Sequence, residues 1–128
     1  APLFEGFRER AQEVRAMLRS EDTLFLMVTA PGEDRLPDTM FFLRRLKEAG
    51  HHLGPVLVNQ VHPAPVNSPS SPGLDLLRYL GARDQRGVAQ FHQRLASGPP
   101  VVVLPLTANP PTDLASLEAL GAQVLAGL

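Results

Sequence analysis

The hydrophobic residues of this chain follow two kinds of pattern. Short, nearly continuous apolar runs occupy residues 24–29, 56–61 and 101–104, and each has a proline or glycine close to it. Such runs, without clean alternation, are typical of strands that helices cover on both faces. Longer stretches between them repeat their apolar residues at spacings of three and four, as amphipathic helices do. The pattern predicts an α/β fold in three layers, with a mainly parallel sheet of about three strands and flanking helices.

The first two strands and the segment between them form the clearest unit. A helix is predicted from Asp34 to Ala49, because Pro37 suits its first turn and Gly50 is placed just beyond its end. A strand, a helix and a second strand in this order make a βαβ unit with parallel strands. We therefore expect a ligand site at the carboxyl ends of these strands.

The remaining chain predicts further helices and one irregular segment. An amphipathic helix is expected over residues 3–19, and the proline- and serine-rich residues 64–73 form a loop. A short helix stopped by Gly81 and a second one capped by Asp84 follow, which predicts a helical hairpin. Loop and hairpin together make residues 64–98 an insertion between strands.

The last predicted helix begins at Thr112 or Asp113. Gly121 lies inside it, and a glycine there costs about 1 kcal/mol relative to alanine. We therefore expect Gly121 to mark close packing against a neighbouring element.

Composition sets limits on partners and location. The chain has 128 residues, enough for a single α/β domain or a fragment of one, and a net charge of -1 that gives no reason to expect nucleic acid. It has no cysteine, no apolar run long enough to cross a membrane and no signal peptide, so a cytoplasmic location is expected. The chain starts Ala-Pro-Leu, and three strands would leave an apolar sheet edge open, which together suggest that part of the fold is missing.

Several catalytic and metal-binding signatures are absent from the sequence. There is neither GxxxxGK[ST] nor GxGxxG, and the only lysine, Lys47, lies late in a predicted helix. The chain is therefore not expected to bind or hydrolyse a nucleoside triphosphate alone. GxSxG and HExxH are missing as well. His51 and His52 could chelate a metal, but without cysteines or clustered carboxylates nearby a solvated turn is favoured and no metal is expected.

Polar residues follow the second predicted strand. Asn59, Gln60 and His62 lie where open α/β sheets bind ligands. The amide of Asn59 could offer an acceptor and a donor to the edge of a base such as adenine, or it could only satisfy backbone groups of the adjoining loop. Glu33 and Asp34 are interpreted as complementing the helix dipole, with catalysis as a weaker alternative.

Three stretches resemble a known family. VTAPGEDRLPDTMFFLRRLKEAG, LGPVLVNQVHP and VVVLPLTANPPTDLASLEALGAQVL are similar to the carboxyl-terminal half of the ArsA-type P-loop ATPases, which serve arsenical pumps and tail-anchored protein targeting. The resemblance covers about residues 23–125 and is weakest over residues 64–97. It implies that Asn59 and Gln60, from VNQ, and the loop of Pro105, Leu106 and Thr107 bind the adenine of ATP. The family's phosphate loop, coupling aspartates and switch segments have no counterpart here, so the fold implied is an incomplete P-loop NTPase-like one.

Three functional interpretations stay open. The favoured one is the carboxyl-terminal part of an ArsA-like anion-transporting or targeting ATPase, which supplies the adenine side of the site and a surface for a protein client. It would need the amino-terminal P-loop half to handle ATP and Mg²⁺, and alone it would self-associate, as a homodimer for example. The second is a non-catalytic binding or scaffold module that pairs through its open sheet edge or apolar helical face. The third is a small enzyme that uses His62 or the His51–His52 pair.

Overall fold

The fold is α/β, as predicted, with a three-stranded parallel sheet and four helices. A computed structural model describes residues 2–128. Along the chain the elements are α1 (Pro2–Arg19), β1 (Phe25–Thr29), the short 3-10 helix η1 (Glu33–Arg35), α2 (Leu36–Glu48), β2 (Leu53–Val61), α3 (Pro72–Arg94), β3 (Val101–Pro105) and α4 (Leu114–Ala126). The strands lie in the order β1-β2-β3, so β2 is central and the other two are edges.

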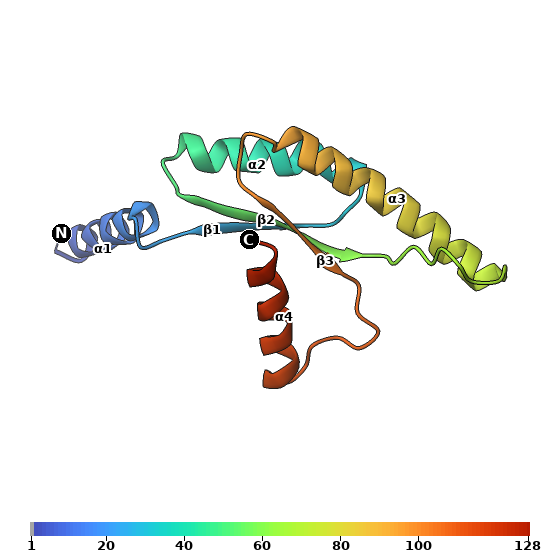
Figure 1. Ribbon diagram of the computed structural model, residues 1–128. Helices are drawn as coiled ribbons and strands as arrows, with labels where there is room; N and C mark the ends of the chain where they lie inside the picture. Colours follow the sequence, from blue (N-terminus) through green and yellow to red (C-terminus); the bar gives the residue numbers. More distant parts are fainter. Residues whose placement is uncertain (1) are drawn as a thin grey trace.

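The two faces of the sheet carry separate cores. Figure 1 shows α2 and α3 on one face and α4 on the other. On the first face, Val56 and Val58 of β2 are fully buried beneath α2 and α3, together with Phe91. On the second face, Leu57 of β2 joins Val102 and Leu104 of β3 against α4. Because neighbouring residues of a strand point to opposite faces, the near-continuous apolar run of β2 reflects its cover on both sides.

The predicted helical hairpin is wrong, because residues 72–94 form one helix of 23 residues. It begins where the hydroxyl of Ser71 accepts a hydrogen bond from the Leu74 backbone N–H, and it passes through Gly81 and Gly87 without a break. Both glycines are buried, and a Cβ at Gly81 would lie 2.6 Å from the carbonyl oxygen of Pro63. A Cβ at Gly87 would overlap the carbonyl oxygen of Pro31. The glycines therefore serve close packing against two loops and do not end the helix.

The ends of α2 and α4 follow the sequence signals. Gly50, just past α2, has a φ of 81°, a conformation that favours glycine. Asp113 caps α4 in a reciprocal capping box with Ser116. The expected close packing at Gly121 is wrong, since no atom outside its own helix backbone and chain neighbours lies within 4 Å of a Cβ built there. No helix among residues 2–128 is long and apolar enough to cross a membrane.

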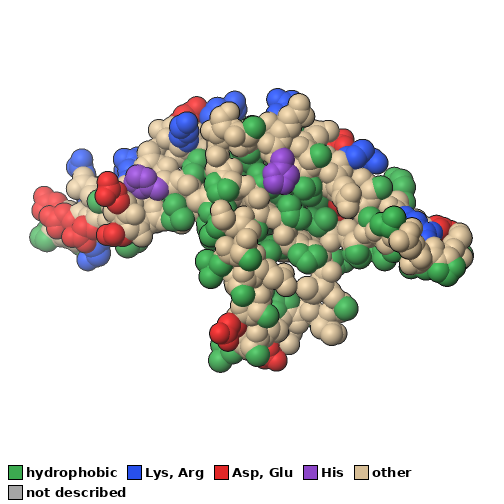
Figure 2. Space-filling model, in the orientation of Figure 1, with side chains coloured by type: hydrophobic (Ala, Val, Ile, Leu, Met, Phe, Trp, Pro, Cys, Tyr) green, Lys and Arg blue, Asp and Glu red, His purple; other side chains and the backbone are tan. Residues whose placement is uncertain are grey.

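A large apolar surface is left uncovered beside β1. Helix α1 forms as predicted, but none of its residues is buried and Figure 1 shows it extending beyond the sheet. On β1 and just before it, Leu24, Leu26 and Val28 are 60%, 52% and 58% exposed. Val28 pairs with Leu57 of β2, so this stripe lies on the α4 face of the sheet, but α4 packs against β3. Figure 2 shows hydrophobic side chains at the surface across the middle of the molecule. Such exposure is typical of a surface that a further element or partner covers.

Candidate functional site

An irregularity at the carboxyl end of β2 shapes the candidate site. β2 and β3 pair in regular register as far as Val58 and Val103, after which the next pair is Val61 with Pro105. Between these pairs Gln60 has a φ of 60°, which is uncommon for a residue other than glycine. The Leu106 N–H then donates to the Val61 carbonyl over 2.9 Å. Bulges of this kind redirect side chains and are frequent beside active sites.

The five residues predicted to bind adenine line one pocket. It has a volume of about 470 Å³ and is bounded by the end of β2, the loop after β3 and one side of α4. The lining residues are Asn59, Gln60, Pro105, Leu106, Thr107, Asn109, Pro110, Pro111, Ser116, Ala119, Leu120 and Gln123. The structure therefore brings together side chains that the sequence separates by more than forty residues.

The Asn59 amide is half-buried at the rim of this pocket. Within residues 2–128 no hydrogen bond uses its side chain, and the loop is held by the Thr107 hydroxyl, which donates to the Asn109 carbonyl over 2.9 Å. The alternative role for Asn59, satisfying the backbone of the loop, is therefore not realised. Its donor and acceptor are both available to a ligand.

The pocket suits a base better than a triphosphate. Leu106, Ala119 and Leu120 offer apolar contacts, and the amides of Asn59 and Gln123 offer donors and acceptors for a polar edge. No arginine or lysine is among the lining residues. Within residues 2–128 no group of three or more acidic or histidine side chains is placed to hold a metal ion. The residues present fit an adenine, but they do not supply a phosphate loop or a Mg²⁺ site.

A second polar cluster lies on the other side of the β2 end, and the sequence did not predict it. Asp84 is fully buried in the middle of α3, although it was expected to cap a helix. One carboxylate oxygen accepts from the His62 backbone N–H over 3.0 Å and lies 2.7 Å from His62 Nδ1. The other accepts from Nε and Nη2 of Arg83 over 3.0 and 2.7 Å. The carboxylate thus joins α3 to the chain that leaves β2.

The environment of Asp84 keeps it ionised. Burial is the largest single influence and opposes the charge, but the hydrogen bonds from the His62 backbone, the His62 ring and Arg83 together outweigh it. The pKa of Asp84 is therefore lowered below its ordinary value. The Asp84 carboxylate in turn raises the pKa of Arg83, first by its hydrogen bond and then by its charge.

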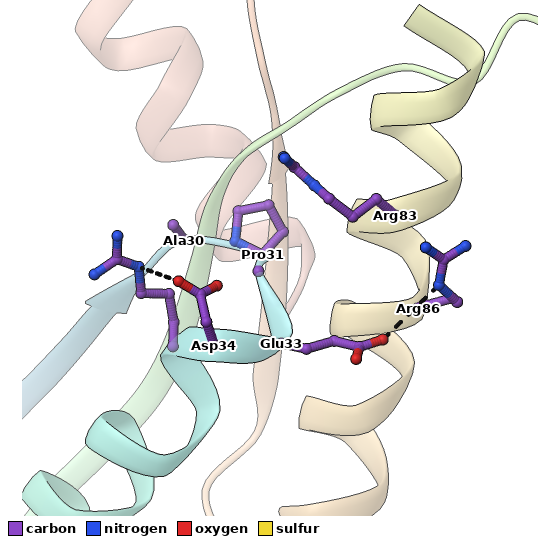
Figure 3. Close-up of a pocket in the computed structure, with 8 residues that line it drawn as sticks. Ala30, Pro31, Glu33, Asp34, Arg83 and Arg86 are labelled. Carbon is purple, nitrogen blue, oxygen red and sulfur yellow. Dashed lines mark ion pairs between the residues drawn. The ribbon is translucent and has the colours of Figure 1, made fainter. Parts of the chain in front are cut away.

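Two cavities open next to this cluster. The smaller, of about 280 Å³, is lined by His62, Arg83 and Asp84 together with Ala30, Pro31, Gln60 and Leu106. The larger, of about 440 Å³, lies between the loop after β1 and α3. Figure 3 shows Arg83 reaching across it toward Pro31, while Arg86 turns to Glu33. The Arg86–Glu33 pair spans 3.8 Å and is largely exposed, so it contributes little to stability.

His51, the first of the two histidines after α2, makes structural contacts. His51 Nδ1 lies 2.9 Å from the Leu18 carbonyl, and its ring lies 4.5 Å from the Phe25 ring. These contacts connect the segment after α2 to the end of α1 and to the start of β1. Glu33 and Asp34 lie in η1, where Asp34 meets Arg35 at 3.5 Å.

Comparisons with known proteins add no assignment. No protein-family model matches the chain, and no curated protein matches it at a significant level. The class that the structure defines is an α/β protein with a three-stranded parallel sheet and polar side chains gathered at the carboxyl end of its central strand.

Proposed function

We propose that this chain is the carboxyl-terminal part of an ArsA-like ATPase and supplies the adenine side of a nucleotide site. The observation that carries the proposal is the single pocket formed by Asn59, Gln60 and the loop Pro105, Leu106 and Thr107. Asn59 and Gln60 are predicted both from their place at a strand end and from the family resemblance, and the loop is predicted from the resemblance; parallel strands bring their carboxyl ends to one edge. In this proposal the phosphate loop, ATP and Mg²⁺ sites belong to an amino-terminal half, and the chain alone does not hydrolyse ATP.

The uncovered surface supports the same proposal. A P-loop half would add strands beside β1, where the sheet edge is open, and would cover Leu24, Leu26 and Val28. Unpaired strand edges and apolar stripes of this kind are normally covered in a complete domain. The exposed face of α2 with Phe41 and Phe42 remains available for a protein client.

Asn59→Ala tests the assignment. In a protein that joins this chain to the P-loop half of an ArsA-type ATPase, the substitution is expected to weaken ADP binding by about 1–3 kcal/mol, because the base edge loses its buried partner. Isothermal titration calorimetry measures the difference. Asn67→Ala is the matched control, since Asn67 is exposed in the loop before α3 and outside the pocket. An unchanged affinity in Asn59→Ala contradicts the adenine assignment.

A second candidate is a non-catalytic binding module, and the exposed stripe of β1 favours it. Leu24, Leu26 and Val28 present apolar side chains next to an open strand edge. Such a module would form a species of fixed stoichiometry that ignores nucleotide. Sedimentation velocity over a concentration series, with and without ATP and magnesium, separates the two: one species of fixed size at every concentration supports the module, whereas nucleotide-independent association that grows with concentration supports a fragment with an uncovered sheet edge.

A further inference from the structure

The imidazole of His62 lies between a buried carboxylate and an open cavity. An ionised Asp84 can only accept hydrogen bonds, so the 2.7 Å contact places the proton of His62 on Nδ1. The other ring nitrogen, Nε2, then carries the lone pair. The His62 side chain is 25% exposed, whereas Asp84 is fully buried. The geometry fixes the tautomer, and the partly exposed ring lines the cavity.

Arg83 adds a donor to the same cavity. Its Nε and Nη2 are used by Asp84, which leaves the Nη1 group of the guanidinium outside that pair. The side chain of Arg83 is 43% exposed and lines the cavity of about 280 Å³ together with His62. The other charged groups nearby are Arg86, which faces Glu33, and Asp34, which meets Arg35. Asp84 and Arg83 carry opposite charges and pair directly with each other.

We propose that His62 and Arg83 bind a phosphate group in this cavity, with Asp84 as a positioning residue. A phosphate exists in neutral solution with and without one of its protons. A neutral His62 accepts the O–H of the protonated form at Nε2, and a protonated His62 donates to the dianion. The Arg83 guanidinium donates to the phosphate in both cases, and such charge-assisted hydrogen bonds are strong.

The phosphate could belong to the free ion or to a nucleotide. Gln60 and Leu106 line this cavity and also the predicted adenine pocket, so the two adjoin at the β2 end. The inference rests on the His62 cluster and does not depend on the adenine assignment. One set of titrations can therefore test the two separately.

The first experiment is an NMR titration of the ¹⁵N-labelled 128-residue chain with inorganic phosphate, observed at the histidine ring nitrogens. We expect His62 Nδ1 to carry its proton before addition and His62 Nε2 to shift saturably during it. His92, exposed on the same helix as Asp84, is expected to stay unchanged. Sodium chloride at matched ionic strength is the control. No shift at His62, or the same shift with chloride, overturns the proposal.

Variants identify the residues. His62→Gln and Arg83→Gln are each expected to lower phosphate affinity about tenfold or more, the usual effect of removing a hydrogen bond to a charged group. His92→Gln should leave it unchanged. Asp84→Asn should alter the His62 tautomer, seen in the ring nitrogen shifts, as well as the affinity. If His62→Gln binds phosphate as tightly as the unchanged chain, the proposed site is refuted. The wild-type titration keeps the test valid if a variant fails to fold.

Adenosine and adenosine monophosphate distinguish the source of the phosphate. Adenosine probes the pocket around Asn59, inorganic phosphate probes the His62 cavity, and the monophosphate probes both. Tighter binding of the monophosphate than of either part assigns the cavity to a nucleotide phosphate. Binding of inorganic phosphate without adenosine supports the present inference and shows that the pocket around Asn59 does not hold the base without the amino-terminal half, so the adenine assignment is then decided by Asn59→Ala in the joined protein. Binding of adenosine without any response to phosphate gives the reverse result.

Discussion

Substitution of Gly87 by alanine tests the packing that builds the His62 cluster. Gly87 is buried in α3, one turn beyond Asp84, and a Cβ there would overlap the carbonyl oxygen of Pro31. The clashing atom belongs to the backbone of the loop between β1 and η1, so the clash cannot be relieved by the rotation of a side chain. Overpacking costs about 1–3 kcal/mol, and a backbone clash belongs at the upper end of that range. Alanine recovers about 1 kcal/mol of helix propensity, so Gly87→Ala should lower the free energy of unfolding by about 2 kcal/mol.

Gly121→Ala is the matched control for this prediction. Gly121 lies within α4, where nothing outside the local helix would meet an added Cβ, so alanine there should raise the free energy of unfolding by up to about 1 kcal/mol. Urea unfolding followed by circular dichroism measures both variants against the unchanged chain. In the folded Gly87→Ala chain, the NMR signals of the His62 ring nitrogens should also shift. The added Cβ would displace α3 from the loop, and Asp84 would then move relative to His62. If Gly87→Ala is as stable as Gly121→Ala and the His62 signals do not shift, the close contact between Gly87 and Pro31 is refuted.

Two further predictions concern charge and exposed surface. The pKa of Asp84 in the folded chain lies below its ordinary value of 3.8, so the stability it contributes is complete above that pH and is lost as pH falls through the folded pKa. The difference in unfolding free energy between the unchanged chain and Asp84→Asn should therefore shrink on acidification below 3.8, and a constant difference in urea titrations would contradict this. Leu26→Lys should reduce self-association in sedimentation velocity, whereas Leu76→Lys, at a similarly exposed leucine of α3, should not. Equal effects of the two substitutions would show that the β1 stripe is not the contact.

The sheet and the pocket at the carboxyl ends of its strands could be predicted because both follow from short-range patterns. Apolar runs indicated the three strands, and Gly50 and Asp113 indicated helix ends that the structure confirms. Once the strands are parallel, their carboxyl ends must meet, which brings Asn59 close to Pro105. The bulge that leaves Gln60 with a φ of 60° could not be predicted, since no glycine marks it.

Helix α3 shows why the His62 cluster was missed. Gly81 was interpreted as a helix end, so Asp84 became a cap and its place on the buried face was lost. Read as one helix, the segment places Asp84 in line with Gly81, Gly87 and Phe91, all of them buried. A charged residue on an otherwise apolar or glycine stripe requires a partner, because an unpaired buried carboxylate is costly. That stripe was the signal available in the sequence.

The same two glycines connect the fold to the proposed chemistry. Gly81 and Gly87 lie three residues before and after Asp84, and they contact the chain that follows β2 and β1 respectively. Any side chain at either position would move the helix outward and lengthen the 2.7 Å contact between Asp84 and His62. Glycine in a helix interior is destabilising by itself. At these two positions its cost is offset because the close packing lets the Asp84 carboxylate form its hydrogen bonds at the strand ends. A purely structural helix could have covered the sheet with alanine and leucine, whereas this helix brings an ionised group to the place where α/β sheets bind ligands.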